Sequence, residues 1–128
     1  MKDHKMGLDV AQQELARFIE SMHLDIDKGK MKPEDLEAYE KQESVLLNAI
    51  QNGSMIVNDK GEPAAFGLTF REPRGADFMA MDRRKTSESY AKMLVLMGSI
   101  TGEPVETFAK MENHKLKVCQ AVVIHFLA

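Results

Sequence analysis

Histidine is the residue type most often used for both metal binding and proton transfer, and this sequence has four of them. They are spread along the chain, at His4, His23, His114 and His125. Metal sites use histidine and cysteine in short, paired spacings, and these positions show none. The sequence therefore predicts no metal site.

Two further side chains, Cys119 and Ser99, could act as nucleophiles in another setting. Cys119 lies in an apolar stretch, where a reduced thiol packs as a small hydrophobic group and lacks the cationic surroundings of a reactive thiol. Ser99 lies near the end of an amphipathic pattern, without the strand-to-helix turn that exposes the serine of a hydrolase. Glycine-rich phosphate loops and dinucleotide fingerprints are also missing from the sequence. We therefore expect a protein that is not an enzyme and binds no cofactor.

Charge gives one local feature, the basic cluster Arg83–Lys85, with Arg71 and Arg74 nearby. It is either a solvated linker or a docking patch for an acidic partner or a phosphate group, and neighbouring acidic residues dilute its field. The whole chain has a net charge of −3. A net acidic chain lacks the broad positive field that binds phosphate backbones, so we expect no nucleic-acid partner.

The 128 residues have room for one hydrophobic core. Apolar runs fall far short of the roughly 18 residues that a membrane span requires, so we expect no membrane association. The charged start, Met1 to Met6, does not resemble the apolar core of a secretion signal. A location in the cytoplasm follows as an expectation.

The elements that position these residues begin with two amphipathic helices. Asp9 and Gln12 are spaced as a capping box that opens the first helix, which fades near Leu24. Pro33 suits the first position of the second helix, which ends at Asn52 and Gly53. The short link between them predicts an antiparallel hairpin. Residues 1–53 hold 7 Lys/Arg against 11 Asp/Glu, so this hairpin is acidic.

After Gly53 the hydrophobic period changes, and residues 54–57 and 64–70 predict a short β-hairpin around a turn at residues 58–61. Pro63 cannot donate to a neighbouring strand, so the returning strand is an edge or begins after it. Helices are predicted from Gly75, from Thr86 or Ser87, from Pro104 and from about Asn113. The predicted fold is mainly α (α+β): a helical hairpin, a short β-hairpin and a small bundle of three to four helices.

Two regions are therefore expected, an acidic helical hairpin at residues 1–53 and a β-hairpin with a helical bundle at residues 54–128. The sequence leaves open whether they fold apart or as one compact unit.

Methionine is abundant, with ten residues against no tryptophan. Methionine fills irregular gaps in cores and also lines adaptable binding surfaces. Met93, Leu96 and Met97 are therefore candidates for a surface that faces a partner protein, and the alternative is that they belong to the core.

From Leu68 to Phe78 the sequence reads Leu-Thr-Phe-Arg-Glu-Pro-Arg-Gly-Ala-Asp-Phe. This string resembles the opening of the tail assembly chaperones of long-tailed bacteriophages, the Mu-like group, in which a strand runs into an Arg-Glu-Pro-x-Gly-x-Asp turn and a helix. With the later helices, the resemblance covers roughly residues 56–128. It implies a protein absent from the finished virion, which coats the tape measure protein and recruits tail tube subunits in the cytoplasm of the host cell.

The resemblance also implies roles for residues of the string, namely Arg71, Glu72, Pro73, Gly75 and Asp77. These would fix the strand-to-helix corner, with Asp77 as an anion at the helix N-terminus. Met93, Leu96 and Met97 would face the client protein. The alternative function is a small regulatory adaptor that acts through its acidic N-terminal helices. A homo-oligomer is compatible with either function.

Overall fold

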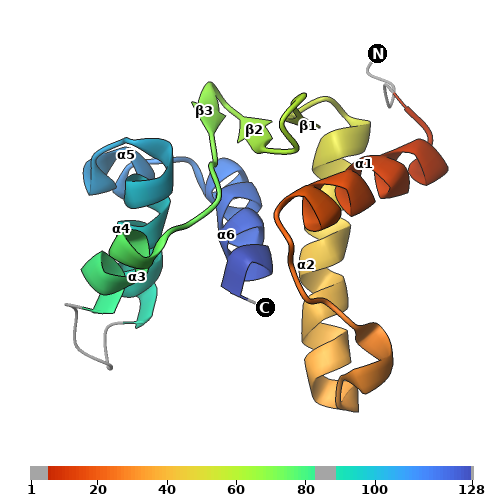
Figure 1. Ribbon diagram of the computed structural model, residues 1–128. Helices are drawn as coiled ribbons and strands as arrows, with labels where there is room; N and C mark the ends of the chain where they lie inside the picture. The colour runs from red at the N-terminus through yellow and green to blue at the C-terminus, as the bar shows by residue number, and fades with distance from the viewer. Residues whose placement is uncertain (1–5, 83–88, 128) are drawn as a thin grey trace.

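The computed structural model describes residues 6–82 and 89–127. It is mainly helical, with one small sheet (Figure 1). In chain order the elements are α1 (Leu8–Ser21), the 3-10 helix η1 (Lys28–Lys30), α2 (Pro33–Gln51), β1 (Met55–Val57), β2 (Pro63–Ala65), β3 (Leu68–Thr69), α3 (Gly75–Asp82), α4 (Ser89–Thr101), α5 (Val105–Ala109) and α6 (Asn113–Leu127). The predicted mainly helical α+β class is confirmed.

The start of α2 was predicted correctly, and the start of α1 was not. α2 begins at Pro33 and ends beside Asn52, as predicted. The capping box at the start of α1 was wrong, because Gly7 is the residue before the helix and makes no side-chain cap. Asp9 lies inside the first turn, where its carboxylate accepts from the amide of Val10 at 3.0 Å. A carboxylate in the first turn still interacts favourably with the positive end of the helix dipole.

The sheet has three antiparallel strands in the order β1-β2-β3, one more than predicted. The predicted hairpin is present, but the expectation for its returning strand was wrong, because β2 is the central strand and begins at Pro63, opposite Val57. A second hairpin follows, because Phe66 and Gly67 form a two-residue turn with φ of 56° and 79°. Positive φ at both central residues is the pattern of a type I′ turn, which normally carries Asn or Gly. Phenylalanine gives no such signal, so this turn was missed.

The turn between β1 and β2 rests against the end of α1. Gly61 has φ of +82°, and a Cβ built there would lie 2.2 Å from the Cβ of Ser21. The guanidinium of Arg17 donates to the backbone oxygens of Val57 at 2.6 Å and Asn58 at 2.7 Å. Since these bonds use carbonyls at the end of β1, α1 partly covers that edge of the sheet.

The C-terminal helices pack around α6. α3 and α4 form a helical hairpin, and α6 lies between α4 and α2 in Figure 1, in contact with both. The predicted basic cluster Arg83–Lys85 and the predicted caps Thr86 and Ser87 lie outside the described residues.

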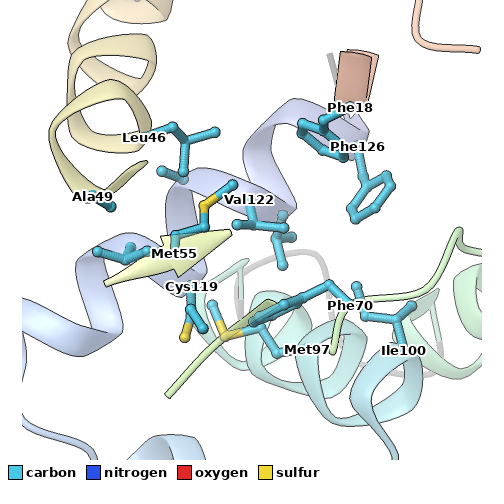
Figure 2. Packing of buried hydrophobic residues seen from close by; sticks show 14 of the residues in the cluster. Phe18, Leu46, Ala49, Met55, Phe70, Met97, Ile100, Cys119, Val122 and Phe126 are labelled. Carbon is cyan, nitrogen blue, oxygen red and sulfur yellow. The ribbon is translucent and has the colours of Figure 1, made fainter. Parts of the chain in front are cut away.

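A single hydrophobic cluster joins residues from α1, α2, the sheet, α4, α5 and α6. Figure 2 shows Phe18 against Phe126, and Phe70 beside Met97. α6 is the central element, with eight buried residues: Leu116, Val118, Cys119, Ala121, Val122, Val123, His125 and Phe126. The prediction that Cys119 is a core residue is confirmed, and burial raises the pKa of its thiol to about 12.

Within the described ranges, none of the helices combines the length and the apolar character that a membrane span needs.

Candidate functional site

The residues singled out by the family resemblance meet at the corner between β3 and α3. Asp77 is 2% exposed and forms a two-bond ion pair with Arg71. Nη1 and Nη2 of Arg71 each donate to one carboxylate oxygen of Asp77, both at 2.8 Å. This fork-to-fork arrangement is the strongest form of side-chain ion pair and fixes both groups in one geometry.

Two further donors complete the surroundings of the Asp77 carboxylate. The amide of Arg74, the residue before α3, donates to Oδ2 at 2.6 Å, and the hydroxyl of Ser99 in α4 donates to Oδ1. The Arg74 bond is one half of a capping box, in which a side chain in the first turn holds the amide before the helix. Asp77 therefore ties the corner to α3 and α4 together.

Arg71 also binds the backbone of α4. Its Nη2 donates to the carbonyl oxygen of Ser99 at 3.0 Å, and its own amide lies 3.3 Å from the carbonyl oxygen of Ile100. The segment after β3 is thus fastened to the last turns of α4 by both side chain and main chain.

The electrostatics keep this pair charged. The hydrogen bonds from Arg71 hold the pKa of Asp77 well below its usual range; burial opposes them, and the bonds from Ser99 and Arg74 add to them. The hydrogen bond to Asp77 raises the pKa of Arg71. Since neither group changes protonation near neutral pH, the pair is suited to holding a shape and not to proton transfer.

A polar cleft of about 490 Å³ lies in front of the corner. It is lined by Ser21, Met22, Lys60, Glu62, Arg71, Glu72, Pro73 and Arg74. The structure thus brings three predicted residues, Arg71, Glu72 and Pro73, to one surface, with Asp77 buried behind them. Gly75 begins α3 and does not line the cleft. With cations and carboxylates side by side, the cleft has no dominant sign of charge.

The predicted partner-facing residues of α4 are placed differently. Leu96 and Met97 are fully buried in the core, which corrects the expectation that they face a partner. The physical reason is that α4 packs against α3 on one side and α6 on another. Only Met93 is partly exposed, and it packs against the same core. The alternative interpretation, that these are core residues, is correct for Leu96 and Met97.

A second, more apolar groove of about 270 Å³ was not foreseen from the sequence. It lies between α2, α6 and the β2–β3 turn and is lined by Val45, Asn48, Ala49, Asn52, Ser54, Phe66, His114, Lys117 and Val118. The ammonium of Lys115 lies 5.7 Å from the centre of the Phe66 ring, within the range of a cation–π contact. The groove joins residues 45–54 with residues 114–118, a proximity that only the packing of α2 on α6 creates.

The sequence also gave no sign that one titratable group, His125, is buried. His125 is fully buried in α6, with its Nδ1 2.8 Å from the carbonyl oxygen of Ala121. Its Nε2 has no hydrogen-bond partner among the described residues. The rings of Tyr39 and Phe18 lie 5.1 and 6.2 Å from the imidazole, centre to centre. Burial lowers the pKa of His125, against smaller opposing effects of the Ala121 carbonyl and the Glu43 carboxylate.

Acid is therefore expected to destabilise the fold through His125. An unfolded histidine titrates near pH 6.5, and folding lowers that pKa, so below about pH 6.5 the unfolded state binds more protons. The free energy of unfolding should fall as the pH drops from about 7 to about 5, and the fall should be shallower in His125→Leu. Urea unfolding at several pH values measures this. The exposed His114 provides the control, since His114→Gln should keep the wild-type dependence of the unfolding free energy on pH. An equally steep dependence in His125→Leu would show that His125 is not the source of the acid sensitivity.

In the part of the chain that is described, three or more His, Cys, Asp or Glu side chains nowhere gather closely enough to hold a metal ion. Comparison of the chain with protein-family models, with curated proteins and with solved structures found no match.

Proposed function

We propose that this protein is a tail assembly chaperone of a long-tailed bacteriophage or prophage. In this role it binds the tape measure protein in the cytoplasm of the host cell and recruits tail tube subunits to it. The observation that supports the proposal most is the corner built by residues 68–78. The string that carries the resemblance forms one continuous strand-to-helix unit, and its Arg71 and Asp77 are locked together.

A non-catalytic, protein-binding role also fits the chemistry of the surface. The ion pair between Arg71 and Asp77 makes the corner rigid and leaves no reactive group there. The apolar groove between α2 and α6 gives an apolar side chain of a client a place to pack.

The alternative function, a regulatory adaptor, would act through α1 and α2. Its support is that Leu8 and Val10 of α1 are 50% and 43% exposed. However, Leu46 and Ile50 of α2 are buried in the cluster shared with α6, so these helices are built into the common core. We therefore favour the chaperone.

The decisive experiment is co-expression with the tape measure protein encoded by the same phage or prophage. The full chain should keep the tape measure protein soluble and co-purify with it, whereas the tape measure protein alone should aggregate. A tape measure protein that is equally soluble without this chain, and that does not co-purify with it, would refute the proposal.

The same assay separates the two functions. Replacing Leu8 and Val10 together by serine removes the exposed apolar side chains of α1 and leaves the buried face of that helix unchanged. The chaperone function predicts that this variant still retains the tape measure protein. An adaptor that works through α1 would show no binding of the tape measure protein by either form.

A further inference from the structure

The groove between α2 and α6 has an apolar floor. Val45 and Ala49 of α2 form one wall, Val118 of α6 forms the other, and Phe66 from the β2–β3 turn closes one end. Its volume, about 270 Å³, is below the range of about 300–1,000 Å³ for small-molecule pockets. A groove of this size accommodates an apolar anchor side chain from another protein.

The lining of the groove includes basic but no acidic side chains. Lys117 and His114 line it, and none of its lining residues is acidic. Lys117 is exposed on α6 and forms none of the ion pairs among the described residues. In a chain with a net charge of −3, a groove lined by one lysine and by no carboxylate favours an acidic partner.

Phe66 gives a second, independent indication. Its φ of 56° lies in the left-handed region, which costs a residue with a Cβ about 1–2 kcal/mol. Asparagine or glycine would occupy this turn position at lower cost. The ring is only partly buried, so the core recovers just part of that cost. Backbone strain of this kind is often kept at functional positions, and Phe66 lines the groove.

From these observations we infer that the groove is a docking site for an acidic amphipathic helix of the partner protein. An apolar side chain of that helix packs on Phe66, Val45 and Val118, and a carboxylate one turn away pairs with Lys117. The inference rests on the proposed function, in which the helix belongs to the tape measure protein. It adds where on this chain that protein binds.

Two variants test the groove with the co-expressed tape measure protein, by measuring the Kd of purified full-length chains. Phe66→Asn removes the anchor surface and relieves the turn, so binding should weaken at least about tenfold while thermal stability stays equal or rises. Lys117→Glu reverses the exposed charge and should weaken binding by a similar factor. Wild-type binding should also weaken as salt rises, and this dependence should shrink in Lys117→Glu.

Matched controls are two exposed side chains that do not line the groove. Met79, 65% exposed in α3, and Lys30, whose side chain is 86% exposed in η1, are the apolar and the basic control. Met79→Asn and Lys30→Glu should bind with the wild-type Kd.

Wild-type affinity in both Phe66→Asn and Lys117→Glu would overturn the docking site while leaving the proposed function intact. Equal losses in the two controls would also overturn it, because the effect would not be specific to the groove. A wild-type chain that fails to bind the tape measure protein would instead refute the proposed function, and this inference with it.

Discussion

Phe126→Ala should lower the free energy of unfolding by about 3–5 kcal/mol, the usual cost of deleting a buried aromatic side chain. Phe126 is 8% exposed, and its ring lies edge-on to that of Phe18, with centres 5.4 Å apart. Truncation would leave a cavity between α6 and α1 and remove the aromatic contact as well. Urea unfolding followed by circular dichroism measures the loss.

The neighbouring residue supplies the control for this substitution. Leu127 is in the same helix but 45% exposed, so Leu127→Ala should change the free energy of unfolding by no more than about 0.5 kcal/mol. Similar losses in the two variants would contradict the central position of α6.

Asp77→Ala should cost about 3 kcal/mol, at the lower end of the range for breaking a buried ion pair. The substitution leaves the guanidinium of Arg71, the amide of Arg74 and the hydroxyl of Ser99 without their acceptor. The Arg71 side chain is 37% exposed, so water can recover part of its solvation, which keeps the cost near the lower limit. Denaturant unfolding at neutral pH measures the change.

The pH dependence of Asp77→Ala adds a second readout. Because folding lowers the pKa of Asp77, its contribution is complete above the unfolded value of about 3.9 and is lost as the pH falls further. The gap between wild type and Asp77→Ala should therefore narrow below about pH 4. Asp25 is exposed and serves as the control, since Asp25→Ala should be near neutral. If the two alanine variants proved equally stable, the corner would not depend on the ion pair.

The parts of the fold that could be predicted from the sequence are those determined by residues next to one another in the chain. Pro33 and the Asn52-Gly53 pair marked the ends of α2, because caps and turns act within one or two residues of themselves. The β2–β3 turn was missed because Phe66 adopts a conformation that its residue type disfavours. Residue propensities could not predict a turn whose residue disfavours the conformation that the turn requires.

In the candidate site, too, the contacts between residues close in sequence could be predicted, whereas those that depend on long-range packing could not. The family resemblance of the string from Arg71 to Asp77 implied a corner, and the residues that form it are close in sequence. Ser99 was dismissed as a nucleophile, and its bond to Asp77, 22 residues away, depends on how α4 packs against α3. The burial of Leu96, Met97 and His125 likewise depends on long-range packing, which an apolar stripe alone does not define.

The place of α6 in the core has a consequence for biosynthesis. Ribosomes make α6 after every other described element, yet α1 and α2 bury their apolar faces in the cluster that α6 completes. Until residues 113–127 leave the exit tunnel, side chains such as Phe18 and Leu46 lack the part of the cluster that α6 supplies. The shared core is therefore complete only after α6 has emerged, and a product terminated before residue 113 would expose apolar surface to proteolysis and aggregation.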